Sequence, residues 1–219
     1  CKMKQYMVIG AGRFGVSVAK TLIREGQEVM LVDGSEEVVQ QLSEDIENIA
    51  IVDVADEMAL KNAGLNNFDV AIVAIGTDLR ASIMATLIAK ESGVPYVISK
   101  AKDKLQAQVL HKIGADKVIF PEVDMGEKLA KSLVFENVLD YMDIDENHTI
   151  FEMRVPSSWV GKNMIDLQIR NKFSMNVVAV KKDKHFEVPA DPNKEFSPED
   201  IIVVAGKIKD IQKVAKGML

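Results

Sequence analysis

The 219-residue sequence contains one cysteine, few aromatic residues and no long apolar run. A single cysteine excludes an internal disulfide framework and a metal site built on paired cysteines. The longest apolar runs, residues 70–75 and 201–205, have strand length and fall well short of the roughly 20 residues of a membrane-spanning helix. The three histidines are far apart and lack the spacing of metal ligands. We therefore expect a cytoplasmic protein.

Acidic residues outnumber basic ones by 33 to 27, which gives a net charge of −6 at neutral pH. This balance disfavours a general nucleic-acid or anionic-lipid surface. Hydrophobic residues make up 47% of the chain, which is enough to build a core. The length fits one large domain, or one medium and one small domain.

The first 120 residues alternate short apolar runs with amphipathic stretches. Apolar runs predict six strands, at residues 6–10, 28–33, 48–52, 69–75, 96–100 and 117–120. The helices predicted between them mostly begin after Asp or Ser and end at Gly. The strands are continuously apolar, so both faces of their sheet should be covered by helices. The pattern predicts an α/β fold with a doubly wound parallel sheet of the Rossmann type.

The pattern changes after residue 122. Residues 123–141 read as one long helix with an apolar stripe made by Met125, Leu129, Leu133 and Val134. We expect this stripe to pack against a second subunit, with Val138, Tyr141 and Met142 continuing the contact. Residues 143–148 form a polar, acidic break. The domain boundary is therefore placed there, with a Rossmann domain and its terminal helix over residues 1–142 and a small α+β domain over residues 143–219.

Residues 10–15 (GAGRFG) fit the G-x-G-x-x-G pattern between a predicted strand and a predicted helix. Gly10 allows a tight turn, Gly12 lets a phosphate approach the backbone, and Gly15 permits close packing of the helix. The helix that begins at Arg13 and Phe14 offers free N–H groups and positive potential to a phosphate. The segment is predicted to bind the phosphates of a nucleotide.

Two charged residues refine that prediction. Asp33 ends the second predicted strand, where a carboxylate accepts hydrogen bonds from ribose hydroxyls and repels a 2′-phosphate. Arg13 adds a cation at the start of the phosphate-binding helix. The terminal phosphates of ADP or ATP carry more charge than the pyrophosphate of a dinucleotide, so Arg13 favours ADP or ATP over NAD(H).

Residues at other strand ends can close the same site, because ligands of such sheets lie beyond the carboxyl ends of the strands. Asp53 follows the third strand and is a candidate for the adenine amino group. Ala74, Ile75 and Gly76 lie at the end of the fourth strand and are candidates to pack near the base or ribose. Lys100 ends the fifth strand and is a candidate to bind a phosphate. Glu122 follows the sixth, where it would hold a metal on the phosphates or pair with Arg13.

No feature of the sequence points to catalysis. A dehydrogenase needs a proton donor and an orienting cation in a substrate domain, and the short C-terminal region offers no such pair. A P-loop sequence is absent, which excludes hydrolysis of that type. We therefore expect a nucleotide sensor rather than an enzyme. A small NAD-dependent oxidoreductase and a soluble NADH-binding redox sensor remain as alternatives.

The motifs together resemble the cytosolic regulatory subunits of Trk/Ktr-type potassium uptake systems. These proteins contain an RCK (regulator of K⁺ conductance) nucleotide-binding domain followed by an RCK C-terminal domain. The resemblance is carried by residues 8–15 (VIGAGRFG), Val32 and Asp33, Asp53 with Asp56 and Glu57, and residues 73–76 (VAIG). It continues through residues 114–116 (GAD), 121–122 (PE) and 124–126 (DMG), and in the C-terminal region through residues 161–163 (GKN) and 201–206 (IIVVAG).

The resemblance implies partners and ligands. Subunits of this family form dimers and an eight-membered ring beneath a membrane-embedded potassium channel or transporter, of one subunit type or with a paralogous second one. That places the chain at the inner face of the cell membrane. The Gly-Arg-Phe-Gly version is associated with ATP and ADP, and the Trk version with NAD(H).

Residue roles carry over from the family to matching positions. Arg13 and Lys100 would contact phosphates, and Asp33 and Ser35 would contact the ribose. Asp53 would contact adenine, with Val54 beside it. Glu122 would lie near the terminal phosphate with a divalent cation. In some relatives the C-terminal domain binds cyclic di-AMP, and Arg170 and Asn176 lie in the matching region.

Overall fold

The protein is described by a computed structural model that covers residues 3–134, 138–183 and 185–215. Its contacts divide the chain into two compact units, one ending at Asp124 and the other beginning at Met125. Each unit has its own sheet and its own apolar core. Among the described residues, no helix is long and apolar enough to cross a membrane.

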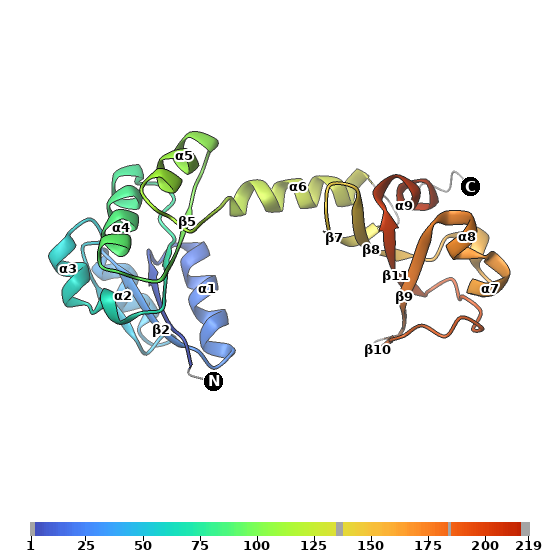
Figure 1. Cartoon of the computed structure of the whole chain (residues 1–219). Helices are drawn as coiled ribbons and strands as arrows, with labels where there is room; N and C mark the ends of the chain where they lie inside the picture. The colour runs from blue at the N-terminus through green and yellow to red at the C-terminus, as the bar shows by residue number, and fades with distance from the viewer. Residues whose placement is uncertain (1–2, 135–137, 184, 216–219) are drawn as a thin grey trace. The chain divides into compact units, whose positions relative to one another are not determined.

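The N-terminal unit is built on a six-stranded parallel sheet with the strand order β3-β2-β1-β4-β5-β6. Helices lie on both sides of this sheet (Figure 1), which confirms the predicted doubly wound fold. The strands are β1 Gln5–Ile9, β2 Glu28–Asp33, β3 Ile49–Ile51, β4 Val70–Val73, β5 Tyr96–Lys100 and β6 Lys117–Ile119. The helices are α1 Arg13–Arg24, α2 Glu36–Leu42, α3 Glu57–Asn62, α4 Leu79–Glu91 and α5 Lys104–Lys112.

The central strand β1 is buried on both of its faces, which explains its continuously apolar sequence. Met7 and Ile9 are fully buried in a cluster with Leu60 of α3 and Ile88 of α4. Val8 points to the other side of the sheet and is fully buried in a cluster with Ala19 of α1. Successive side chains of a strand face opposite ways, so a strand covered on both faces needs apolar residues throughout.

The helix α6 (Pro121–Val134) ends earlier than the sequence pattern predicted. The last residues of the predicted 123–141 helix are in a strand instead, β7 (Val138–Asp143). This strand pairs antiparallel with β8 (His148–Arg154). Residues 135–137 of that prediction lie outside the described part of the chain. Since β7 belongs to the second sheet, the contacts divide the chain between Asp124 and Met125 instead of after residue 142.

The C-terminal unit contains a five-stranded antiparallel sheet with the order β10-β9-β11-β8-β7. Its further strands are β9 Met175–Lys182, β10 His185–Glu187 and β11 Ile201–Lys207, and its helices are α7 Met164–Leu167, α8 Ile169–Phe173 and α9 Ile208–Ala215. Trp159 is buried in its core, where it stacks on Phe196 with ring centroids 6.0 Å apart. The predicted α+β class is confirmed, whereas β7 and the three-residue β10 were not predicted.

Candidate functional site

The glycine loop links β1 to α1 at the carboxyl edge of the parallel sheet. Gly10 has a φ of +106°, a left-handed conformation that favours glycine, and its N–H donates to Val32 O at 2.8 Å. A Cβ atom on Gly15 would overlap the carbonyl oxygen of Gly10, whereas a Cβ on Gly12 would meet nothing within 4 Å. Gly15 is therefore required by the packing of α1 on the loop, and Gly12 is not required by any protein contact.

The first turn of α1 leaves backbone donors available. The other four helices of the parallel-sheet fold begin with an N-cap side chain, from Ser35, Asp56, Asp78 or Asp103, that accepts a backbone N–H. The N-cap of α1 is Gly12, which has no side chain to do so. Unpaired N–H groups at a helix N-terminus bind anions, and phosphate above all.

Asp33 faces the glycine loop from the end of β2. Its Oδ2 accepts a hydrogen bond from Ala11 N–H at 2.6 Å, and its Oδ1 accepts one from Ser35 N–H at 2.9 Å. The carboxylate is thus held between two loops at the carboxyl edge of the sheet. Each carboxylate oxygen has a second lone pair, so the group can still accept bonds from ribose hydroxyls.

Lys100 and Glu122 form an ion pair at the opposite side of the loop. Lys100 Nζ donates to Glu122 Oε1 at 2.5 Å and lies 5.9 Å from the ring centroid of Phe14. The side chain of Lys100 is 11% exposed and that of Glu122 is 68% exposed. The hydrogen bond from Lys100 holds the pKa of the Glu122 carboxyl below its ordinary value, and the charges of Lys100 and Arg13 add to this effect.

These residues line one open cavity of about 710 Å³. Eleven of the fourteen residues predicted from the sequence line it: Gly10, Gly12, Arg13, Phe14, Asp33, Val54, Ala74, Ile75, Gly76, Lys100 and Glu122. Three do not. Gly15 lies beneath the loop, and Ser35 uses its Oγ to cap α2, accepting from Val38 N–H. Asp53 turns its carboxylate onto its own loop, where Oδ1 accepts from Ala55 N–H at 3.0 Å.

The cavity also has lining residues that the sequence analysis missed. They are Ala11, Gly34, Val38, Thr77, Asp78, Ala81 and Lys102. Lys102 lies two residues beyond β5, in a loop at the carboxyl ends of the strands, where ligands of such sheets bind. Its position in the sequence could therefore have predicted that it lines the cavity. Asp78 is the N-cap of α4.

A second cavity, of about 490 Å³, lies in the C-terminal unit. Arg170 and Asn176 line it together with apolar side chains that include Met164, Ile165 and Ile169. Arg170 Nε donates to Asn176 Oδ1 at 2.6 Å. In the described part of the chain, no group of three or more His, Cys, Asp or Glu side chains is arranged to hold a metal ion by itself.

The fold and the first cavity define a class of protein. An uncapped helix N-terminus, a carboxylate beside the glycine loop and nearby cations at the carboxyl edge of a doubly wound sheet make a Rossmann nucleotide-binding domain. Family models match both units, the TrkA-N domain over residues 6–121 and the TrkA-C domain over residues 149–218. The chain belongs to this TrkA-N/TrkA-C family.

Two similar relatives come from Bacillus subtilis (strain 168). Ktr system potassium uptake protein C is 42% identical over 216 residues, covering 99% of this chain and 98% of the relative. Ktr system potassium uptake protein A is 39% identical over 212 residues, covering 97% and 96%. The similarity therefore extends over both units.

A solved structure supports the fold. The crystal structure of the GsuK RCK domain has a TM-score of 0.53 and 18% sequence identity, and the match covers 99% of this chain. This chain spans 46% of the length of that one. At such low identity, the likeness supports the arrangement of helices and strands alone.

Proposed function

We propose that this chain is a nucleotide-binding regulatory subunit that gates a potassium channel or transporter. The carrying observation is that the glycine loop, Asp33 and the cations Arg13 and Lys100 line the same cavity. The relatives whose whole length it matches are named potassium uptake proteins. Nucleotide binding in the cavity would then shift a channel between two conformational states and would not drive a reaction.

ATP or ADP is the proposed ligand in preference to NAD(H). Arg13 and Lys100 line the cavity and are proposed to bind the phosphates, and the terminal phosphates of ATP carry more charge than a dinucleotide pyrophosphate. Ser35 and Asp53 are proposed to contact ribose and adenine after their loops adjust to the ligand. A divalent cation at Glu122 would need phosphate oxygens as its remaining ligands, since the described residues supply no metal-binding cluster.

Arg13→Ala tests this assignment. Arg13 is proposed to contact the terminal phosphates, so its loss should reduce the discrimination between ATP and ADP by about tenfold, or about 1.4 kcal/mol. Calorimetric titration of both nucleotides measures the ratio of affinities. Arg24→Ala, at the exposed last turn of α1, removes the same charge away from the cavity and should leave the ratio unchanged. An Arg13 variant that keeps the wild-type ratio would contradict the proposal.

A regulatory role also predicts no turnover. The two alternatives are a small NAD-dependent oxidoreductase and a redox sensor that binds NADH without a membrane partner. Oxidation or reduction of a dinucleotide by the purified protein would support the first alternative. Failure to recover a membrane partner, together with tight binding of NADH, would support the second.

We further propose that the chain assembles into dimers and an octameric ring at the inner face of the cell membrane. On α6, Met125, Leu133 and Val134 are 64%, 74% and 65% exposed, which is a high cost for apolar side chains left in water. Burial against a second subunit would remove that cost. Light scattering at micromolar concentration should give the mass of an oligomer, and a monomer would contradict the ring.

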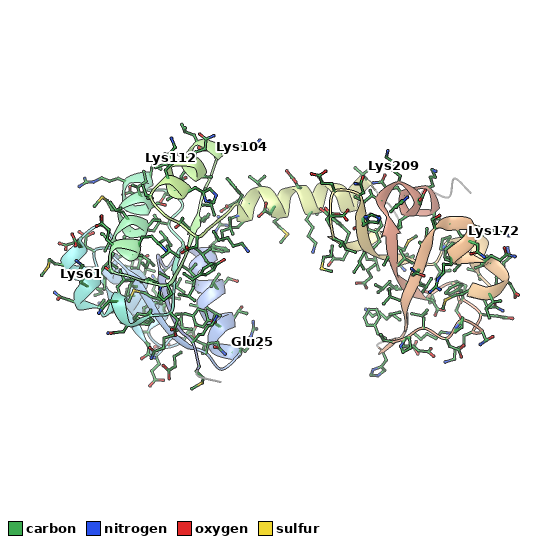
Figure 2. All side chains as sticks on the ribbon, viewed as in Figure 1. Glu25, Lys61, Lys104, Lys112, Lys172 and Lys209 are labelled. Atoms are coloured by element: carbon green, nitrogen blue, oxygen red, sulfur yellow. The ribbon has the colours of Figure 1, made fainter. Side chains whose placement is uncertain are left out.

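Cyclic di-AMP is the ligand proposed for the C-terminal cavity. Arg170 supplies a cation and Asn176 an amide, in an otherwise largely apolar lining. This combination suits a ligand with phosphates and adenine bases. Calorimetric titration of cyclic di-AMP tests the proposal, with Arg170→Ala expected to lose binding and Lys172→Ala, on the same helix, as the control (Figure 2).

A further inference from the structure

We propose that Lys102 sets the preference of the cavity for nucleotides with several phosphates, and that Gln106 positions it. This inference rests on the proposed function, because it assigns a selectivity to the same cavity. Lys102 is exposed and lines the cavity together with Arg13 and Lys100. No residue of the C-terminal unit is needed for it.

The strand order gives the phosphate chain a direction. Asp33, the ribose acceptor, ends β2, and the glycine loop follows β1, next to it. Strand β5, which leads to Lys102, lies on the other side of β1, beyond β4. A ribose at Asp33 with its first phosphate on the α1 N-terminus directs each added phosphate away from β2, toward Lys100 and Lys102.

The ammonium group of Lys102 is available to interact with that phosphate chain. Lys100 is already bonded to Glu122, so this pair adds no net charge to the phosphate side of the cavity. The structure gives the ammonium group of Lys102 no ion pair or hydrogen bond with any residue that it describes. Arg13 and Lys102 therefore bring two positive charges to the cavity, which the carboxylate of Asp78 also lines.

Gln106 fixes the loop that carries Lys102. Its side chain is buried, and its Oε1 accepts the backbone N–H of Lys102 at 3.1 Å. Its Nε2 donates to Ser82 Oγ at 3.3 Å. Ser82 is fully buried on α4, whose N-cap Asp78 lines the same cavity. One amide thus ties the Lys102 loop to the neighbouring helix α4, which limits where the lysine can reach.

Lys102→Gln in the full chain tests the role, with AMP, ADP and ATP titrated calorimetrically. An exposed lysine acting on an added phosphate is expected to change the affinity for ATP by about fivefold, that for ADP by less, and that for AMP hardly at all. Lys104→Gln removes the same charge two residues further on, where the side chain is exposed on α5 and does not line the cavity (Figure 2). It should match wild type for all three nucleotides.

Gln106→Met tests the positioning. It should lower the ratio of ATP to AMP affinity, and combining it with Lys102→Gln should lower the ratio no further, because Gln106 acts through Lys102. A merely structural role would instead weaken AMP and ATP binding equally. Equal losses for AMP and ATP in Lys102→Gln, or an unchanged ratio, would overturn the role of Lys102 alone. A wild-type protein that binds none of the three nucleotides would overturn the proposed function itself.

Discussion

Gly15→Ala is expected to destabilise the N-terminal unit by about 3 kcal/mol, because a methyl group there overlaps the Gly10 carbonyl oxygen and the backbone must move. The effect should show in chemical denaturation followed by circular dichroism. Trp159, the single tryptophan, lies in the core of the C-terminal unit, so its fluorescence monitors that unit separately. An unfolding transition by circular dichroism identical to that of wild type would contradict the packing inferred for α1.

Gly12→Ala is the matched comparison, and its expected effect is on binding alone. A Cβ at Gly12 contacts no protein atom within 4 Å, and its φ of −70° is one that alanine adopts freely. Stability should therefore stay at the wild-type value. The methyl group would nevertheless occupy the space through which a phosphate reaches the first N–H groups of α1. Nucleotide affinity should fall by at least about tenfold, since lost charge-assisted hydrogen bonds cost about 1.5–3 kcal/mol.

Asp33→Ala is expected to weaken nucleotide binding by about 10- to 100-fold. It removes the charged acceptor for the ribose hydroxyls, at a cost of about 1.5–3 kcal/mol. It also leaves the N–H groups of Ala11 and Ser35 without their present acceptor, so the glycine loop loses a restraint. Calorimetric titration of ATP and ADP measures the effect.

Two further variants separate the charge of Asp33 from its shape. Asp33→Asn keeps one oxygen acceptor but loses the charge, and should bind with an affinity between those of wild type and Asp33→Ala. Asp45→Ala removes a carboxylate of the same type that is paired with Lys20 and does not line the cavity, so it should bind like wild type. Unchanged binding in Asp33→Ala would place the nucleotide elsewhere.

The fold of the N-terminal unit was predictable because its signals are local. Strands such as β1 are apolar on both faces, and helix starts carry capping side chains such as Asp56 and Asp103. Strand β7 was missed for a different reason. Met125, Leu129 and Leu133 recur at a spacing of four, and this helical rhythm gives no sign of where it stops. Strand β7 is held by a hairpin in which Tyr141 pairs with Phe151 of β8, and the polar residues 143–148 at its turn were interpreted instead as a domain boundary.

The residues that line the cavity were predictable where a residue type at a strand end has one common role in this fold. The glycines, Asp33 and Lys100 follow that rule, whereas Asp53 shows its limit, because its carboxylate bonds to Ala55 of its own loop. Lys102 was not predicted because it lies two residues beyond the end of β5, in a loop whose path the strand pattern does not give. The loop of Lys102 is held by Gln106, and Gln106 is held in turn by Ser82 of α4, a contact between segments that are distant in sequence.

The ion pair between Lys100 and Glu122 makes nucleotide binding an exchange instead of a simple addition. A phosphate that displaces the Glu122 carboxylate from Lys100 has a measured binding enthalpy that is a difference between two contacts. Where the carboxylate is displaced and no divalent cation joins it to the phosphate, the pKa of Glu122 returns toward its ordinary value, because the hydrogen bond from Lys100 that lowered it is lost. Binding in mildly acidic solution should then take up a fraction of a proton, and affinity should increase as the pH falls toward that pKa.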